Sequence, residues 1–116
     1  MPKRGDRAAP PPARDEWDLV FADNGAAKGW EQLAAQAPGP LREAWLILRS
    51  DPREGAPRNR MHRLKADLKS RVVAGISYEQ WQYEVTGGGR IWYGIDDPRH
   101  TLQITHAGTG HPARTD

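Results

Sequence analysis

A short basic stretch is the first feature of this sequence that could do chemistry. Six lysine and arginine residues fall within residues 58–71, where only Asp67 opposes them. Such a stripe can face the phosphate groups of a nucleic acid. It can also be a solvated helix or loop face, and the charges alone favour that simpler interpretation. The basic residues are Arg58, Arg60, Arg63, Lys65, Lys69 and Arg71.

Arg90 and Trp92 form a second candidate surface. They alternate with Ile91 and Tyr93, so if those two face the core of a sheet, Arg90 and Trp92 must face its other side. There the guanidinium can fork onto a phosphate, and the indole can stack on an unpaired base. A cation–π pair that only shields the indole explains the same pattern. The residues alone do not decide between these interpretations.

Composition limits the class of protein. The 116 residues are 37% hydrophobic and 28% charged, which suits one domain with a modest core to which the five tryptophans contribute. The absence of cysteine excludes disulfides, thiolate metal sites and a cysteine nucleophile. No apolar run has membrane-spanning length, and no hydrophobic stretch follows the basic N-terminus. We therefore expect neither a membrane span nor a signal peptide, and a cytoplasmic location.

The chain is expected to be ordered from about residue 15. Residues 1–14 are rich in proline, alanine and arginine, which predicts a disordered basic tail followed by a single domain over residues 15–116. Trp17, Leu19 and Phe21 then alternate, as in a half-buried first strand. Trp17, together with Trp30, Trp45 and Trp81, is most simply a core residue.

Two helices follow this strand. Asp23 or Asn24 can cap the first, whose apolar residues recur at helical spacing until Pro38-Gly39-Pro40. The second begins near Pro40, a residue tolerated in a first turn, and stops at Asp51-Pro52. We expect a helical hairpin packed on one face of a sheet.

The remaining chain predicts strands. Residues 61–69 indicate a short helical or irregular turn, and residues 71–77 are either a short strand or a loop. Residues 81–86, 90–96 and 101–105 alternate as strands, with the glycines at 87–89 as a hairpin turn. The fold class is therefore α+β, with a helical hairpin covering one face of a twisted antiparallel sheet.

From residue 61 onward the chain resembles the RelE/YoeB family of ribosome-dependent toxins. The resemblance is close over the C-terminal half, and the N-terminal half agrees only in the order of its elements. It implies a RelE-like, microbial-RNase-like toxin domain and a cognate antitoxin as partner. The matching features are MHRLKADLK, the strand from Trp81 to Thr86, Arg90-Ile91-Trp92-Tyr93, Leu102-Gln103-Ile104 and Gly110-His111-Pro112.

The resemblance also implies the roles of individual residues in a metal-free endoribonuclease. His62 stands where the YoeB branch has an acidic general base, and an imidazole can do that work near neutral pH. Arg90 would stabilise the scissile phosphate, and His111, reached with a one-residue gap, would be the general acid. RNA supplies its own nucleophile, the 2′-OH, so we expect no metal and no cofactor. The expected RNA-binding residues are Arg63, Lys65, Lys69 and Trp92.

The sequence departs from the family pattern at two places. Tyr83 and Glu84 stand where family members often carry basic residues, and the segment 69–80 is longer than in compact relatives. Two other histidines are expected outside the site, because His106 follows Ile104 in a core-facing register and His100 lies in a turn.

Three functions fit these features. The first is an mRNA interferase that cuts mRNA on the ribosome, inhibits translation and is neutralised by its antitoxin. The second is a ParE-like poison of DNA gyrase without nuclease activity, and the third is a nuclease that cuts free RNA such as tRNA. A basic groove suits an acidic, partly disordered antitoxin that folds on binding.

Overall fold

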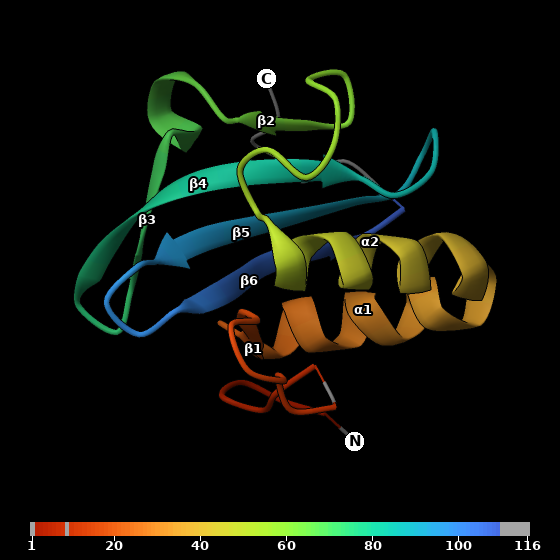
Figure 1. The fold of residues 1–116 in the computed structure, drawn as a ribbon, viewed down its shortest axis with the longest axis horizontal. Coiled ribbons are helices and arrows are strands. Elements are labelled where there is room, and N and C mark those ends of the chain that lie inside the picture. The colour runs from red at the N-terminus through yellow and green to blue at the C-terminus, as the bar shows by residue number, and fades with distance from the viewer. Residues whose placement is uncertain (1, 9, 110–116) are drawn as a thin grey trace.

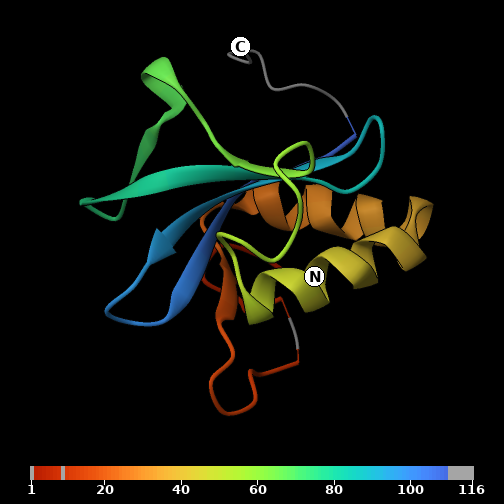
Figure 2. The same cartoon turned by 45° about the horizontal axis from the view of Figure 1, so that its top comes forward.

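The computed structural model of the protein describes residues 2–8 and 10–109. Two helices lie side by side and cover one face of a twisted sheet (Figures 1 and 2). The elements are β1 (Asp18–Phe21), α1 (Asn24–Gln36), α2 (Pro38–Ser50), β2 (Met61–Arg63), a 3-10 helix (Ala66–Leu68), β3 (Ser70–Val73), β4 (Ile76–Glu84), β5 (Arg90–Asp96) and β6 (Thr101–Gly108). This arrangement confirms the predicted α+β class with both helices on one sheet face.

The sheet is mixed rather than wholly antiparallel. Its order is β1-β6-β5-β4-β2, with β3 pairing β4 outside this path. All described pairs are antiparallel except β1 and β6, which run parallel. Leu19 lies beside Leu102 and Phe21 beside Ile104 in that pair. The alternation of apolar residues predicts which face a strand buries but not its direction, so the parallel pairing was not predicted.

The helix boundaries follow local signals in the sequence. Asp23 is the N-cap of α1, and its side chain accepts a hydrogen bond from the Ala26 amide at 2.7 Å. Pro38 starts α2, slightly before the predicted start near Pro40. Proline is tolerated there because an N–H in the first turn of a helix has no partner within the helix, so its absence breaks no hydrogen bond. Asp51 ends α2 as predicted.

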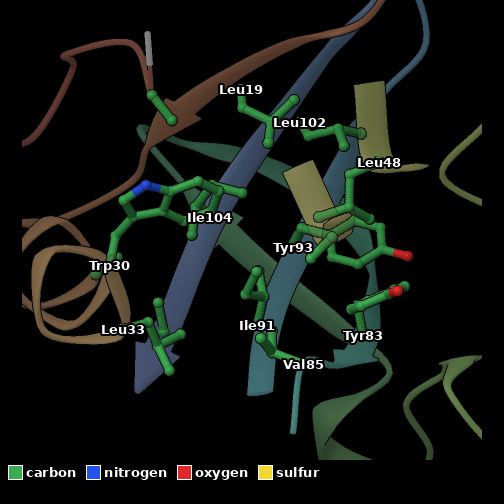
Figure 3. Close-up of a cluster of buried hydrophobic side chains, with 14 of the residues drawn as sticks. Leu19, Trp30, Leu33, Leu48, Tyr83, Val85, Ile91, Tyr93, Leu102 and Ile104 are labelled. Carbon is green, nitrogen blue, oxygen red and sulfur yellow. The ribbon is translucent and has the colours of Figure 1, made fainter. Parts of the chain in front are cut away.

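The core lies between the helices and the sheet (Figure 3). Leu33 and Leu48 of the helices and Ile91, Leu102 and Ile104 of the sheet are fully buried. Of the four tryptophans expected in the core, only one belongs to it outright, and the others pack around it partly buried. The core member is Trp30, and the partly buried ones are Trp17, Trp45 and Trp81.

The segment before β1 lies along the outer edge of that strand. The amide of Ala8 donates to the carbonyl of Leu19 at 2.7 Å, and the amide of Gly5 donates to that of Phe21 at 2.8 Å. Arg7 forms an ion pair with Asp18. Composition predicted a disordered tail here, whereas the structure places residues 5–8 against the strand. The contacts have a physical reason, because an uncovered edge strand leaves backbone groups that need partners.

Gly29 sets how closely α1 approaches the sheet. A Cβ atom at this position would lie 1.7 Å from the carbonyl oxygen of Ala107 in β6. We expect Gly29→Ala to lower the free energy of unfolding by about 1–3 kcal/mol, because helix or strand must shift. Urea denaturation measures this change. The control is Gly39→Ala in the first turn of α2, where the methyl group meets no atom within 4 Å and should cost nothing. Equal stability of the two variants would contradict the close approach.

Candidate functional site

A cavity of about 1300 Å³ opens beside β2. Its walls come from β2, β4 and β5, from the loop after α2 and from residues 64–68. His62, Gln82 and Arg90 line it on the side of the sheet opposite the helices, because they alternate with the buried Met61, Tyr83 and Ile91. The cavity therefore contains part of the uncovered sheet face. The predicted site residues that line it are His62, Arg63, Lys65, Arg90 and Trp92.

Strand register brings the predicted residues together. His62 of β2 pairs with Gln82 of β4, which pairs on its other side with Trp92 of β5. Arg90 lies two residues before Trp92 and so faces the same side of the sheet. Residues that are far apart in the sequence thus lie next to one another on three adjacent strands.

His62 is half-buried at the edge of the cavity. Its Nδ1 lies 3.2 Å from the carbonyl oxygen of Arg63, and its Nε2 lies 3.4 Å from the side-chain nitrogen of Gln82. The ring is therefore held at both nitrogens while it borders the cavity. This fixed position is what a group that exchanges protons with a bound molecule needs.

Arg90 supplies a cation next to this imidazole. Its Nη1 donates to the Gln82 side-chain oxygen at 3.5 Å, and its Nε is buried without a hydrogen-bond partner among the described residues. Glu84 lies opposite it on β4, yet the described part of the chain shows no ion pair to Arg90. The guanidinium is therefore free to bind an anion in the cavity.

The residues of the basic stretch differ in whether they line the cavity. Arg58, Arg63 and Lys65 are exposed and line it, although Arg63 also lies 3.7 Å from Glu79. The flanking arginines pair elsewhere, Arg60 with Glu43 at 3.8 Å and Arg71 with Asp23 at 3.5 Å. Lys69, a predicted RNA-binding residue, is exposed but does not line the cavity.

Trp92 faces the predicted side of the sheet but is not exposed. Its side chain is 4% accessible, and the indole N–H donates to the Gln82 oxygen at 2.8 Å. The expected stacking surface for an unpaired base is therefore absent from this structure. The neighbouring strands β4 and β6 flank the indole, and the ring of His106 lies 5.5 Å from it.

His106 is a correction to the predicted register. The pairing of β5 with β6 has a β-bulge, in which Trp92 pairs with His106 and Tyr93 with Ile104. Thr105 is the extra residue, and it turns His106 to the same side as Trp92 instead of the core. The two-residue period of the strand gives no signal of the bulge, so this second imidazole was not predicted on the uncovered face.

The other predicted residues lie in different places. His111 is outside the described residues. His100 stacks on Trp17 with ring centroids 3.9 Å apart and does not line the cavity. The Tyr93 hydroxyl donates to the carbonyl of Pro52 at 2.7 Å, and burial raises the pKa of this phenol, so it belongs to the core. Tyr83 is also buried in the core, so of the two residues that stand where family members often carry basic ones, Glu84 alone faces the uncovered side of the sheet.

Two further features of the described residues bear on the class of site. They contain no group of three or more histidine, cysteine, aspartate or glutamate side chains that could hold a metal ion. No helix among them has the length and apolar character that crossing a bilayer requires.

Comparison with known proteins identifies the fold. No family model and no curated protein sequence matches the chain. Among solved structures, a chain of the heterotetrameric YoeB–YefM toxin–antitoxin complex from Staphylococcus aureus superposes with a TM-score of 0.57 and 16% identity. The match covers 85% of this chain and 100% of that one, and a second YoeB–YefM structure from the same organism gives the same values. The chain has a YoeB-like fold.

The fold alone does not determine the chemistry of the cavity, which depends on the side chains of this chain that line it. An imidazole, a guanidinium and an ammonium group, from His62, Arg90 and Lys65, line one cavity. Such a set can move a proton and balance the charge of a phosphate. Gln82 was not among the predicted site residues, yet it contacts both His62 and Arg90.

Proposed function

We propose that this protein is the toxin of a toxin–antitoxin pair, and that it is a metal-independent endoribonuclease that cleaves mRNA on the ribosome. The observation that carries the proposal is the presence of His62 and Arg90 in one cavity of a YoeB-like fold. The fold alone would suit several activities, so the argument depends on these side chains.

In the proposed reaction, His62 takes the proton of the RNA 2′-OH. The 2′-oxygen then attacks the adjacent phosphorus, and the bond from phosphorus to the 5′-oxygen breaks. Arg90 and Lys65 balance the negative charge that develops on the phosphoryl oxygens. We assign protonation of the leaving 5′-oxygen to His111, on the family resemblance. The products are a 2′,3′-cyclic phosphate and a free 5′-OH.

The proposed partners follow from the same surface. Arg63 and Lys65 at the cavity rim suit the phosphates of mRNA, and they also suit acidic side chains of an antitoxin that covers the cavity. The antitoxin would then neutralise the toxin by competing with mRNA for the same cationic side chains. Action on translating ribosomes requires the protein to be in the cytoplasm.

The test combines induced expression in bacteria with cleavage by the purified protein. We expect growth and translation to stop, and mRNA on purified ribosomes to be cut in the presence of EDTA, leaving 2′,3′-cyclic phosphate ends. Cutting of naked RNA without ribosomes would replace this proposal with the free-RNA nuclease. A DNA-damage response without RNA cleavage would instead indicate a ParE-like gyrase poison.

A further inference from the structure

Gln82 connects three functional groups of the cavity. It lies in β4, between His62 of β2 and Trp92 of β5, and its side chain is buried. The amide oxygen lies 2.8 Å from the Trp92 indole nitrogen and 3.5 Å from Nη1 of Arg90. The amide nitrogen lies 3.4 Å from Nε2 of His62.

Trp92 determines which way the Gln82 amide points. An indole N–H can only donate a hydrogen bond, so the atom 2.8 Å away must be the amide oxygen. Arg90 is also only a donor, and it shares that oxygen. With the oxygen committed to these two groups, the amide NH2 must face His62.

This orientation sets the tautomer of His62. The amide NH2 can only donate, so Nε2 of His62 must present its lone pair to it. At the opposite side of the ring, Nδ1 lies 3.2 Å from the carbonyl oxygen of Arg63, which can only accept. Two independent contacts therefore require the same neutral tautomer, with hydrogen on Nδ1 and none on Nε2.

We propose that Gln82, oriented by Trp92, is a positioning residue that keeps Nε2 of His62 ready to accept a proton. The use of that proton acceptor in RNA cleavage rests on the proposed function, whereas the tautomer does not. At 3.4 Å the contact of Gln82 with His62 is near the limit of a hydrogen bond and is weak. A substrate 2′-OH can replace the amide as donor and pass its proton to Nε2. Trp92 thus gains a role other than base stacking.

Ring-nitrogen NMR of the full-length, 15N-labelled protein tests the tautomer directly. The His62 signals are identified by their loss in His62→Gln, and the spectrum is taken at a pH where that ring is neutral. In the wild-type protein we expect Nε2 to be of the acceptor type and Nδ1 to carry hydrogen. The opposite pattern in the wild type would overturn the proposal without any need for a variant to fold.

Two variants test the role of the amide. Gln82→Glu puts a carboxylate oxygen opposite Nε2, so that nitrogen should carry a hydrogen in addition to the one on Nδ1, which still faces the Arg63 carbonyl. Trp92→Phe removes the indole donor, which frees the amide to turn, so a mixture of tautomers should appear. The matched control is Gln103→Glu, the same substitution on the same sheet face between the buried Leu102 and Ile104, outside the cavity lining. A His62 spectrum unchanged by Gln82→Glu would overturn the proposal.

Cleavage assays of the same variants separate this proposal from the proposed function. We expect Gln82→Glu to lower the cleavage rate by up to about 10²-fold, the lower end of what a general base contributes, and Gln103→Glu to leave it unchanged. If the tautomer responds as expected but no variant or wild-type protein cleaves RNA, the positioning role stands and the nuclease proposal fails. If RNA is cleaved and the tautomer is the opposite one, the nuclease proposal stands and the positioning role fails.

Discussion

Replacing His62 with alanine is expected to lower the rate of RNA cleavage by about 10²- to 10⁴-fold, the contribution of one general base. The loss corresponds to about 2.7–5.4 kcal/mol in the activation free energy. The reason is that His62 is the one cavity-lining imidazole of the described residues, held at both ring nitrogens by Arg63 and Gln82. Single-turnover cleavage of mRNA on ribosomes measures the loss, and relief of growth arrest gives the same answer in cells.

Three further variants distinguish proton transfer from a structural role. His62→Gln keeps a polar side chain but cannot take up a proton, so it should be as inactive as the alanine variant. His62→Glu restores a carboxylate, the general base that the YoeB resemblance implies at this position, and should recover much of the activity. The matched control is His100→Ala, which removes a histidine stacked on Trp17 far along the sheet. Full activity in His62→Ala would remove His62 from the mechanism.

Local signals predicted most of the fold. Asp23 and the prolines after α1 placed both helices, because capping and the missing proline N–H act within a few residues. The predicted strand over residues 90–96 has the observed bounds of β5, since its alternation lies between a glycine turn and Asp96-Asp97-Pro98. Boundaries that depend on a strand's own residues and on the turns that flank it can therefore be predicted from the sequence.

The features that were missed depend on contacts between distant segments. The parallel pairing of β1 with β6 and the placement of residues 5–8 along β1 depend on which strand edges meet, and the alternation of apolar residues carries no such information. A two-residue period also does not reveal the bulge at Thr105, and this bulge alone explains why the predicted orientation of His106 was wrong.

The candidate site was predicted in part for the same reason. The family resemblance placed His62, Lys65 and Arg90 on segments that do meet at one cavity. Burial of Trp92 and the central position of Gln82 arise from cross-strand neighbours, which the sequence of a single strand does not show. A polar residue at alternating spacing looks solvated until its partners on both adjacent strands are known.

Arg90→Ala is expected to lower the cleavage rate by about 10²- to 10³-fold, as does removal of one donor that stabilises a developing oxyanion. Arg90 is suited to that role because it faces the cavity without an ion pair in the described part of the chain, and its side chain makes only the long hydrogen bond to Gln82 among the described residues. The measurement is the single-turnover rate at saturating ribosome concentration. Because the charge matters most as the phosphorane forms, the loss should appear in the rate of cleavage rather than in binding.

Lysine at the same position separates charge from geometry. Arg90→Lys keeps the positive charge but loses the planar fork that binds two phosphoryl oxygens, so its rate should fall between wild type and alanine. The matched control is Arg42→Ala on the exposed side of α2, which changes the net charge equally and should leave the rate unchanged. If Arg90→Ala weakened ribosome binding as much as Arg42→Ala does and left the cleavage rate intact, Arg90 would act only through the overall charge. A loss confined to the chemical step would instead place the guanidinium at the reacting phosphate, where His62 and the cavity require it.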